Sequence, residues 1–126
     1  MDGNIRWAQH APVLILAVAR LYDYPGKEHN SFYDVGMAVG NLVTQAGHLG
    51  LVTHQMGGFY VDKARELLHI PQGYEPLAMI ALGYPGDLAM LPDDLREREL
   101  APRSRKPLDD FVFEGRWEQP AAEAVA

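Results

Sequence analysis

The stretch of residues 31–60 most constrains how this chain can fold. Apolar or small residues recur in its first part at the i, i+3, i+4, i+7 spacing of an amphipathic helix. These residues are Val35, Ala38, Val39, Leu42, Val43, Ala46 and Leu49. Gly50 follows the last of them and predicts a left-handed helix end. Because the apolar face is wide, we expect other elements to cover this helix, either in the core or at a subunit interface.

The segment after this helix combines a short strand with a double-glycine turn. Residues 51–56 form a short run typical of a strand, and Gly57 and Gly58 follow it directly. Glycine has no Cβ, so backbone N–H groups at such a turn can approach a ligand closely. We therefore expect any chemical site of this chain to include this turn.

The rest of the chain alternates between apolar runs and polar or charged segments. The expected elements are an approach segment at 1–10, a strand buried on both faces at 13–19, a loop at 21–30, a helix at 61–69, a strand at 76–82, a turn at 83–86 and one charged helical turn within 90–99. Composition changes at Asp87. This alternation predicts a mixed α and β protein with about three strands. Three strands leave the central helix with few neighbours, which indicates a further segment or a partner chain.

Size and charge exclude several classes of protein. A chain of 126 residues suits one domain or a piece of one, and its net charge of −6 argues against nucleic acid as a partner. The absence of cysteine excludes disulfides and thiolate chemistry. The longest apolar run, residues 11–19, is about half of what a membrane-spanning helix needs. We expect no membrane partner and, without a signal peptide, a cytoplasmic location.

Motifs that would identify a catalytic or metal site are missing. The sequence contains no dinucleotide fingerprint, phosphate-binding P-loop, zinc-protease motif or serine-hydrolase elbow. The five histidines are scattered, so we predict packing or surface roles for them and no metal site. Arg103 and Arg105 could together clamp a phosphate group. They could equally form a solvated basic turn that pairs with acidic residues 93–99, and the residues alone leave both interpretations open.

An ordered set of short motifs resembles the nitroreductase family. The set covers nearly the whole chain, from Asn4 to Trp117, in the family's order and approximate spacing. It consists of Asn4, Trp7, Ala11 and Pro12 before a buried strand, then Asp34, Gly36, Ala38, Asn41 and Leu42, then Ala46, Gly50 and Leu51, then Gly57, Gly58 and Phe59, then Leu68, Ile70 and Pro71, then Gly83, Tyr84 and Pro85, and finally Arg103, Arg105, Pro107, Leu108, Phe113 and Trp117.

The resemblance implies a fold, a cofactor and a reaction. It implies an α+β, nitroreductase-like fold with a mixed sheet flanked by helices, here incomplete. Residues 1–118 would be the C-terminal portion of that domain and residues 119–126 a disordered tail. Members are usually homodimers with FMN at the interface. They pass hydride from NADH or NADPH through flavin N5 to a nitroaromatic, a quinone or a similar small-molecule acceptor.

The resemblance also assigns five cofactor-binding residues and no catalytic side chain. The backbone at Gly57 and Gly58 would face the N5 and O4 edge of the flavin, and Asn4 would meet the flavin ring or ribityl chain. Arg103 and Arg105 would contribute to the FMN phosphate site. This chemistry needs no titrating protein group, because the cofactor carries the redox step.

The family's Arg- and Ser-rich N-terminal flavin motif has no counterpart before Asn4. An alternative is therefore a non-catalytic remnant of the fold that dimerises or binds another chain without flavin. A further alternative is a module that binds a different phosphate-bearing ligand at the glycine turn and the arginines.

Overall fold

The chain divides into two compact units at the position where its composition changes. The structure, a computed structural model, describes residues 2–24, 27–28 and 31–121. The first unit is Met1–Gly86 and the second is Asp87–Ala126. The expected tail at 119–126 lies partly outside the described residues, so its disorder stays a prediction.

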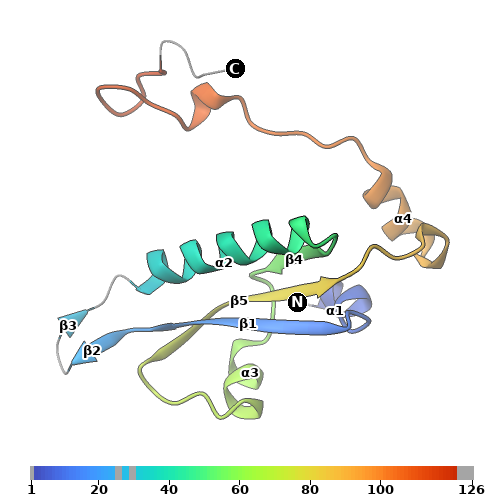
Figure 1. The fold of residues 1–126 in the computed structure, drawn as a ribbon, viewed down its shortest axis with the longest axis horizontal. Helices are drawn as coiled ribbons and strands as arrows, with labels where there is room; N and C mark the ends of the chain where they lie inside the picture. Colours follow the sequence, from blue (N-terminus) through green and yellow to red (C-terminus); the bar gives the residue numbers. More distant parts are fainter. Residues whose placement is uncertain (1, 25–26, 29–30, 122–126) are drawn as a thin grey trace. The chain divides into compact units, whose positions relative to one another are not determined.

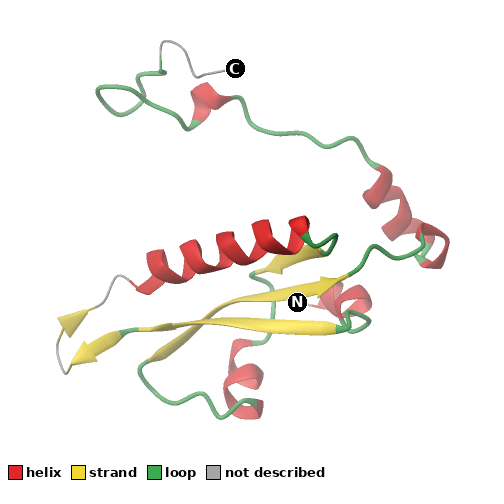
Figure 2. Cartoon of the chain, in the orientation of Figure 1, coloured by secondary structure: helices red, strands yellow, loops and turns green. Residues whose placement is uncertain are grey.

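A three-stranded sheet forms the centre of the first unit (Figure 2). Strands β1 (Val13–Arg20) and β4 (Val52–Met56) flank β5 (Tyr74–Gly83), and both pair with it in antiparallel fashion. The expected mixed sheet is therefore not seen among the described residues, although β1 and β4 run in the same direction. The register shifts where Val18 pairs with Pro76. Proline cannot donate a ladder hydrogen bond, which explains the irregularity at this point of a central strand.

Three helices accompany the sheet. They are α1 (Asp2–Ala8), α2 (Ser31–His48) and α3 (Val61–Leu67). Figure 1 shows α2 along one side of the sheet and α3 on the other side. Gly50 has a φ of 73°, and the N–H of Leu51 donates to the carbonyl of Ala46 at 2.9 Å. The predicted left-handed end of α2 is thereby confirmed.

The core of the first unit is small. The buried hydrophobic residues among the described part of the chain are Ala8, Ala17, Ala19, Ala46, Met56, Ala64, Ile80 and Ala81. Six of these eight are alanines, and Ile80 alone is a large side chain with no exposure. Alanine buries little apolar surface, so this core contributes little hydrophobic stabilisation for a unit of this size.

Three local expectations are wrong. Residues 2–8, expected only as an approach segment, form a helix, because Trp7 and Ala8 pack against Met56 and Ala81. Strand β1 is not buried on both faces, since no described element covers its first residues: Val13 is 45% and Leu14 48% exposed. The expected loop at 21–30 contains β2 (Tyr22–Tyr24) and β3 (Lys27–Glu28), which form an antiparallel pair.

The second unit contains little regular structure. Its elements are the 3₁₀ turn η1 (Leu88–Met90), helix α4 (Asp93–Leu100) and the 3₁₀ turn η2 (Leu108–Asp110). The side chain of Asp87 caps η1 by accepting from the N–H of Ala89 at 2.9 Å. The charged helical turn expected within residues 90–99 is thus present as the longer helix α4.

Candidate functional site

The double-glycine turn lies between the end of β4 and the start of α3. Both glycine carbonyls accept a hydrogen bond. The Phe59 N–H donates to the Gly57 carbonyl at 3.2 Å, and the side-chain amide of Asn4 donates to the Gly58 carbonyl at 3.0 Å. Neither glycine N–H donates in the described turn and loop bonds. In a trans peptide the C=O and the next N–H point in opposite directions. The Gly58 N–H therefore points away from the closed side of the turn, where a ligand atom can accept from it.

Space around Gly57 also suits a ligand. Gly57 is exposed, and a Cβ built on it would meet no atom of the described chain within 4 Å. The glycine is therefore not required by packing within this chain, and its φ does not lie in the left-handed region. A bare backbone with free donors is suited to close approach by a flat, electron-rich group.

Helix α1 holds this turn through Asn4. The bond from Asn4 Nδ2 to the Gly58 carbonyl spans 54 residues of sequence and is partly buried. Three of the five predicted cofactor-binding residues are thus together at one place.

Tyr60, just after the turn, provides a second link to α1, which no sequence pattern predicts. The Tyr60 hydroxyl donates to a carboxylate oxygen of Asp2, and Lys63 Nζ lies 4.8 Å from the centre of the Tyr60 ring. The hydrogen bond to Asp2, followed by the negative charge of that carboxylate, raises the pKa of Tyr60. Tyr60 therefore stays protonated and neutral throughout the physiological range.

Trp7 makes a third contact of α1 with this region. Its ring packs edge-on against His54 of β4, with centroids 4.6 Å apart. Trp7 also packs against the buried cluster of Ala8, Met56 and Ala81. His54 is exposed apart from this ring contact, which agrees with the packing or surface role that the sequence predicts. Among the described residues no group of three metal-ligating side chains occurs.

The two predicted phosphate-binding arginines lie in the second unit. Arg103 and Arg105 are both exposed, in a segment without regular structure between α4 and η2. Arg105 donates to the carbonyl of Ser104 at 2.8 Å. The role of both arginines at the FMN phosphate stays a prediction.

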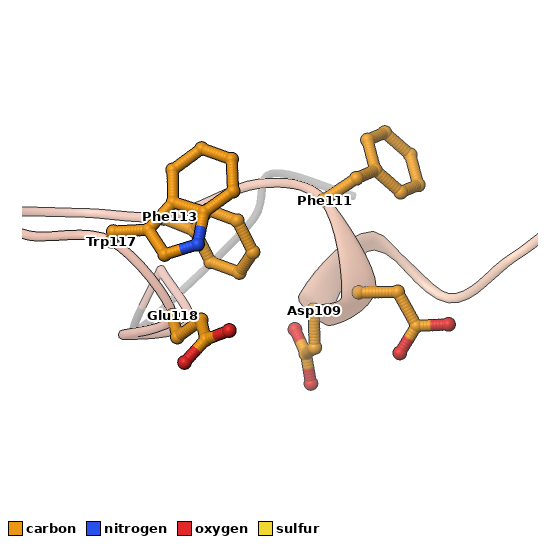
Figure 3. Close-up of a pocket in the computed structure, with 6 residues that line it drawn as sticks. Asp109, Phe111, Phe113, Trp117 and Glu118 are labelled. Atoms are coloured by element: carbon orange, nitrogen blue, oxygen red, sulfur yellow. The ribbon is translucent and has the colours of Figure 1, made fainter.

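A cavity of about 390 Å³ lies elsewhere in the second unit (Figure 3). It is lined by Asp109, Asp110, Phe111, Phe113, Trp117 and Glu118. Phe113 and Trp117 pack with ring centroids 5.0 Å apart. With three carboxylates on its walls this cavity is unsuited to a phosphate, and none of the five predicted site residues lines it.

Together the fold and the turn define an α+β protein that presents backbone donors beside a short antiparallel sheet. The family model described as "Nitroreductase family" matches residues 2–84. The chain belongs to the nitroreductase family. Within the described residues, no helix is long and apolar enough to cross a membrane.

Three individual relatives match most of this chain. A solved structure described as an oxidoreductase containing FMN has a TM-score of 0.83 and 41% identity, covering 93% of this chain and 61% of that one. An uncharacterized 15.4 kDa protein of Mycolicibacterium smegmatis is 35% identical, over 94% of this chain and 79% of its own length. An iodotyrosine deiodinase of Haliscomenobacter hydrossis is 29% identical, over 79% of this chain and 47% of its own length. This chain thus spans about half of the deiodinase and under two thirds of the FMN-containing structure.

Proposed function

We propose that this chain serves an FMN-dependent oxidoreductase of nitroreductase type. NADH or NADPH would be the hydride donor, and a nitroaromatic, a quinone or a similar small molecule the acceptor. The observation that carries the proposal is the likeness to the FMN-containing oxidoreductase, which extends over 93% of this chain. The geometry of the glycine turn supports it, because the turn presents a backbone donor at a place without side-chain obstruction.

The residues of the turn fit a flavin edge. Flavin, when bound, supplies the hydride chemistry of the reaction. The chain's own contribution at the turn is to offer the Gly58 N–H as a donor to an electron-rich ring atom and to admit the ring where Gly57 lacks a Cβ. Neither task requires a side chain that gains or loses a proton.

Arg103 and Arg105 are proposed to bind the FMN phosphate. A guanidinium donates two parallel hydrogen bonds to phosphate oxygens, and a hydrogen bond to a charged group contributes about 1.5–3 kcal/mol. Replacing either arginine by alanine should therefore weaken FMN binding by roughly 10- to 100-fold. Arg98→Ala is the matched control, because it removes the same charge from an exposed position on α4 of the same unit.

The test of the proposed function is reconstitution of the full chain with FMN. Retention of the flavin absorbance after removal of free FMN, bleaching by NADH or NADPH without oxygen, and recovery on adding a quinone or a nitroaromatic are the expected results. A colourless protein that never retains flavin would overturn the proposal. Equal FMN affinity in Arg103→Ala, Arg105→Ala and Arg98→Ala would overturn the phosphate assignment alone.

The outer face of α2 supports a homodimer, with or without flavin. Exposed apolar or small residues recur along this face with alternating spacings of four and three, as in a helix–helix seam. They are Tyr33, Met37, Gly40, Thr44 and Gly47, which we call the outer stripe. None of them is charged, and the Thr44 hydroxyl is satisfied by donating to the Gly40 carbonyl at 2.9 Å. A second copy of α2 could thus pack here without leaving a buried polar group unpaired.

This observation keeps a non-catalytic dimerising module as the second candidate. Light scattering coupled to size exclusion, with and without FMN, separates the two functions. A dimer that forms equally in both conditions and never retains flavin would favour the module. A dimer that forms or tightens with FMN would favour the oxidoreductase, since flavin would then be bound by the assembled pair.

A further inference from the structure

We infer that Asn4 is a positioning residue, which sets the direction of the backbone donors at the glycine turn rather than contacting a cofactor itself. The inference rests on the proposed function only for its consequence on flavin binding. Its structural part concerns the hydrogen bond of 3.0 Å from Asn4 Nδ2 to the carbonyl of Gly58.

The first step of the argument is the geometry of the peptide between Gly58 and Phe59. Its planar, trans form fixes the Phe59 N–H opposite to the Gly58 carbonyl. When Asn4 holds that carbonyl towards α1, the Phe59 N–H is directed away from α1 and donates to Gly57 at 3.2 Å. The Asn4 bond and the closure of the turn are thus two ends of one rigid peptide unit.

The second step carries this constraint to the donor. Closure of the turn holds the Gly57 carbonyl, and planarity of the next peptide then orients the Gly58 N–H away from it. Glycine peptides adopt many conformations at similar energy. Without an external anchor, two consecutive glycines would therefore present this N–H in many directions. Asn4 supplies the anchor from a regular helix.

The third step is that α1 is itself held in place at both ends. Asp2, before Asn4, accepts the hydroxyl hydrogen bond of Tyr60. Trp7, after it, packs on His54, and Ala8 is buried against Met56. An amide on a helix fixed in this way can hold a carbonyl more tightly than one on a loop. The contact partners of α1 thus flank the turn, at residues 54–56 and at residue 60.

The substitution Asn4→Leu tests the inference, because leucine keeps the branched shape but cannot donate. Loss of one ordinary hydrogen bond should open the turn more often, so the Phe59 amide should exchange with solvent roughly fivefold faster in the flavin-free full chain. Gln9→Leu, which removes an exposed amide just after α1, is the matched control and should leave that rate unchanged. Unchanged Phe59 exchange in Asn4→Leu would overturn the inference.

Two further variants keep the test decisive. Exchange at Ile80, in the centre of the sheet, reports whether a variant unfolds as a whole. If Asn4→Leu also accelerates hydrogen exchange of the Ile80 amide, Asn4→Asp is used in its place. Aspartate has the size of asparagine but no hydrogen-bond donor at neutral pH. Asn4→Gln retains the amide and should restore much of the protection. The inference would also be overturned if neither donor-free variant accelerates exchange of the Phe59 amide more than exchange of the Ile80 amide.

FMN titration of the same variants separates positioning from direct contact. A positioning role predicts that affinity for FMN falls by about the same factor as Phe59 exchange rises, roughly fivefold in Asn4→Leu, with recovery in Asn4→Gln. Weaker FMN binding with unchanged exchange would mean that Asn4 contacts the cofactor directly, and would overturn the inference. If the unsubstituted chain binds no FMN, the proposed function fails, while the exchange data still decide whether Asn4 holds the turn.

Discussion

The substitution Tyr33→Ala tests whether the outer stripe of α2 joins two copies of this chain. Tyr33 is 69% exposed in the single chain. An aromatic side chain carries roughly 200 Å² of surface, so full cover by a partner would remove about 140 Å² from water. At about 25 cal/mol per Å², that burial is worth about 3.5 kcal/mol.

Imperfect cover lowers this figure, and truncating an aromatic residue that acts as an interface hot spot costs at least about 2 kcal/mol. Both copies of a homodimer lose the side chain, so the dimer of Tyr33→Ala should dissociate at least roughly 30-fold more readily than the unsubstituted dimer. Sedimentation equilibrium over a range of concentrations measures the two dissociation constants directly. Because Tyr33 is largely exposed in the monomer, the free energy of unfolding at low concentration should change by only about 0.5 kcal/mol.

Leu67→Ala is the control for general loss of exposed apolar surface. Leu67 is 76% exposed and lies on α3, away from the outer stripe. Its removal should change the dissociation constant by less than about threefold, as for a side chain outside an interface. Equal weakening by both substitutions would refute the reasoning, as would an unsubstituted chain that stays monomeric both with and without FMN.

Three other perturbations give separate readouts. Gly57→Val should reduce FMN affinity by tenfold or more, as a clash costing about 1.4 kcal/mol would. Thermal unfolding should stay nearly unchanged, because a Cβ at residue 57 meets no atom of the described residues within 4 Å; equal loss of FMN affinity and of stability would contradict this. Ile80→Ala should lower the free energy of unfolding by about 2–5 kcal/mol in urea titrations, since it empties the centre of the sheet. The raised pKa of Tyr60 means that its hydrogen bond to Asp2 stabilises the fold at pH values below the ordinary pKa of tyrosine. That stabilisation is lost as the pH rises through the raised pKa. Ultraviolet titration should therefore show one tyrosine that ionises at a higher pH than the others, and Asp2→Asn should abolish the difference.

The central helix and the turn after it were predictable from the sequence for a physical reason. The apolar periodicity runs from Val35 to Leu49, over most of the 18-residue helix α2, and is followed by Gly50 in the left-handed region. Both signals are local, so they act wherever the helix packs. The three main strands were equally visible as short apolar runs. The order β1–β5–β4 was not, because strand order depends on contacts between distant segments.

Helix α1 was missed because little in its own sequence stabilises it. It has seven residues, and isolated helices of that length are marginal in water. Its inward residues Asn4, Trp7 and Ala8 do follow helical spacing, but the polar Asn4 interrupts the apolar pattern. The partner of that amide lies 54 residues away, so only the tertiary structure reveals it. The resemblance placed Asn4 at the site, while its bond to Gly58 could not be predicted.

Apolar surface is left open on two different elements of the described chain. Val13 and Leu14 of β1 and the outer stripe of α2 are all exposed, whereas the buried residues are mostly alanines. Soluble proteins rarely expose extended apolar surface to water, because covering such surface stabilises an assembly in proportion to the area buried. The inner face of α2 packs on the sheet, so the outer stripe is surplus to the fold of one chain. A second copy would use it, and the glycines that weaken α2 as an isolated helix would then allow close approach of two backbones.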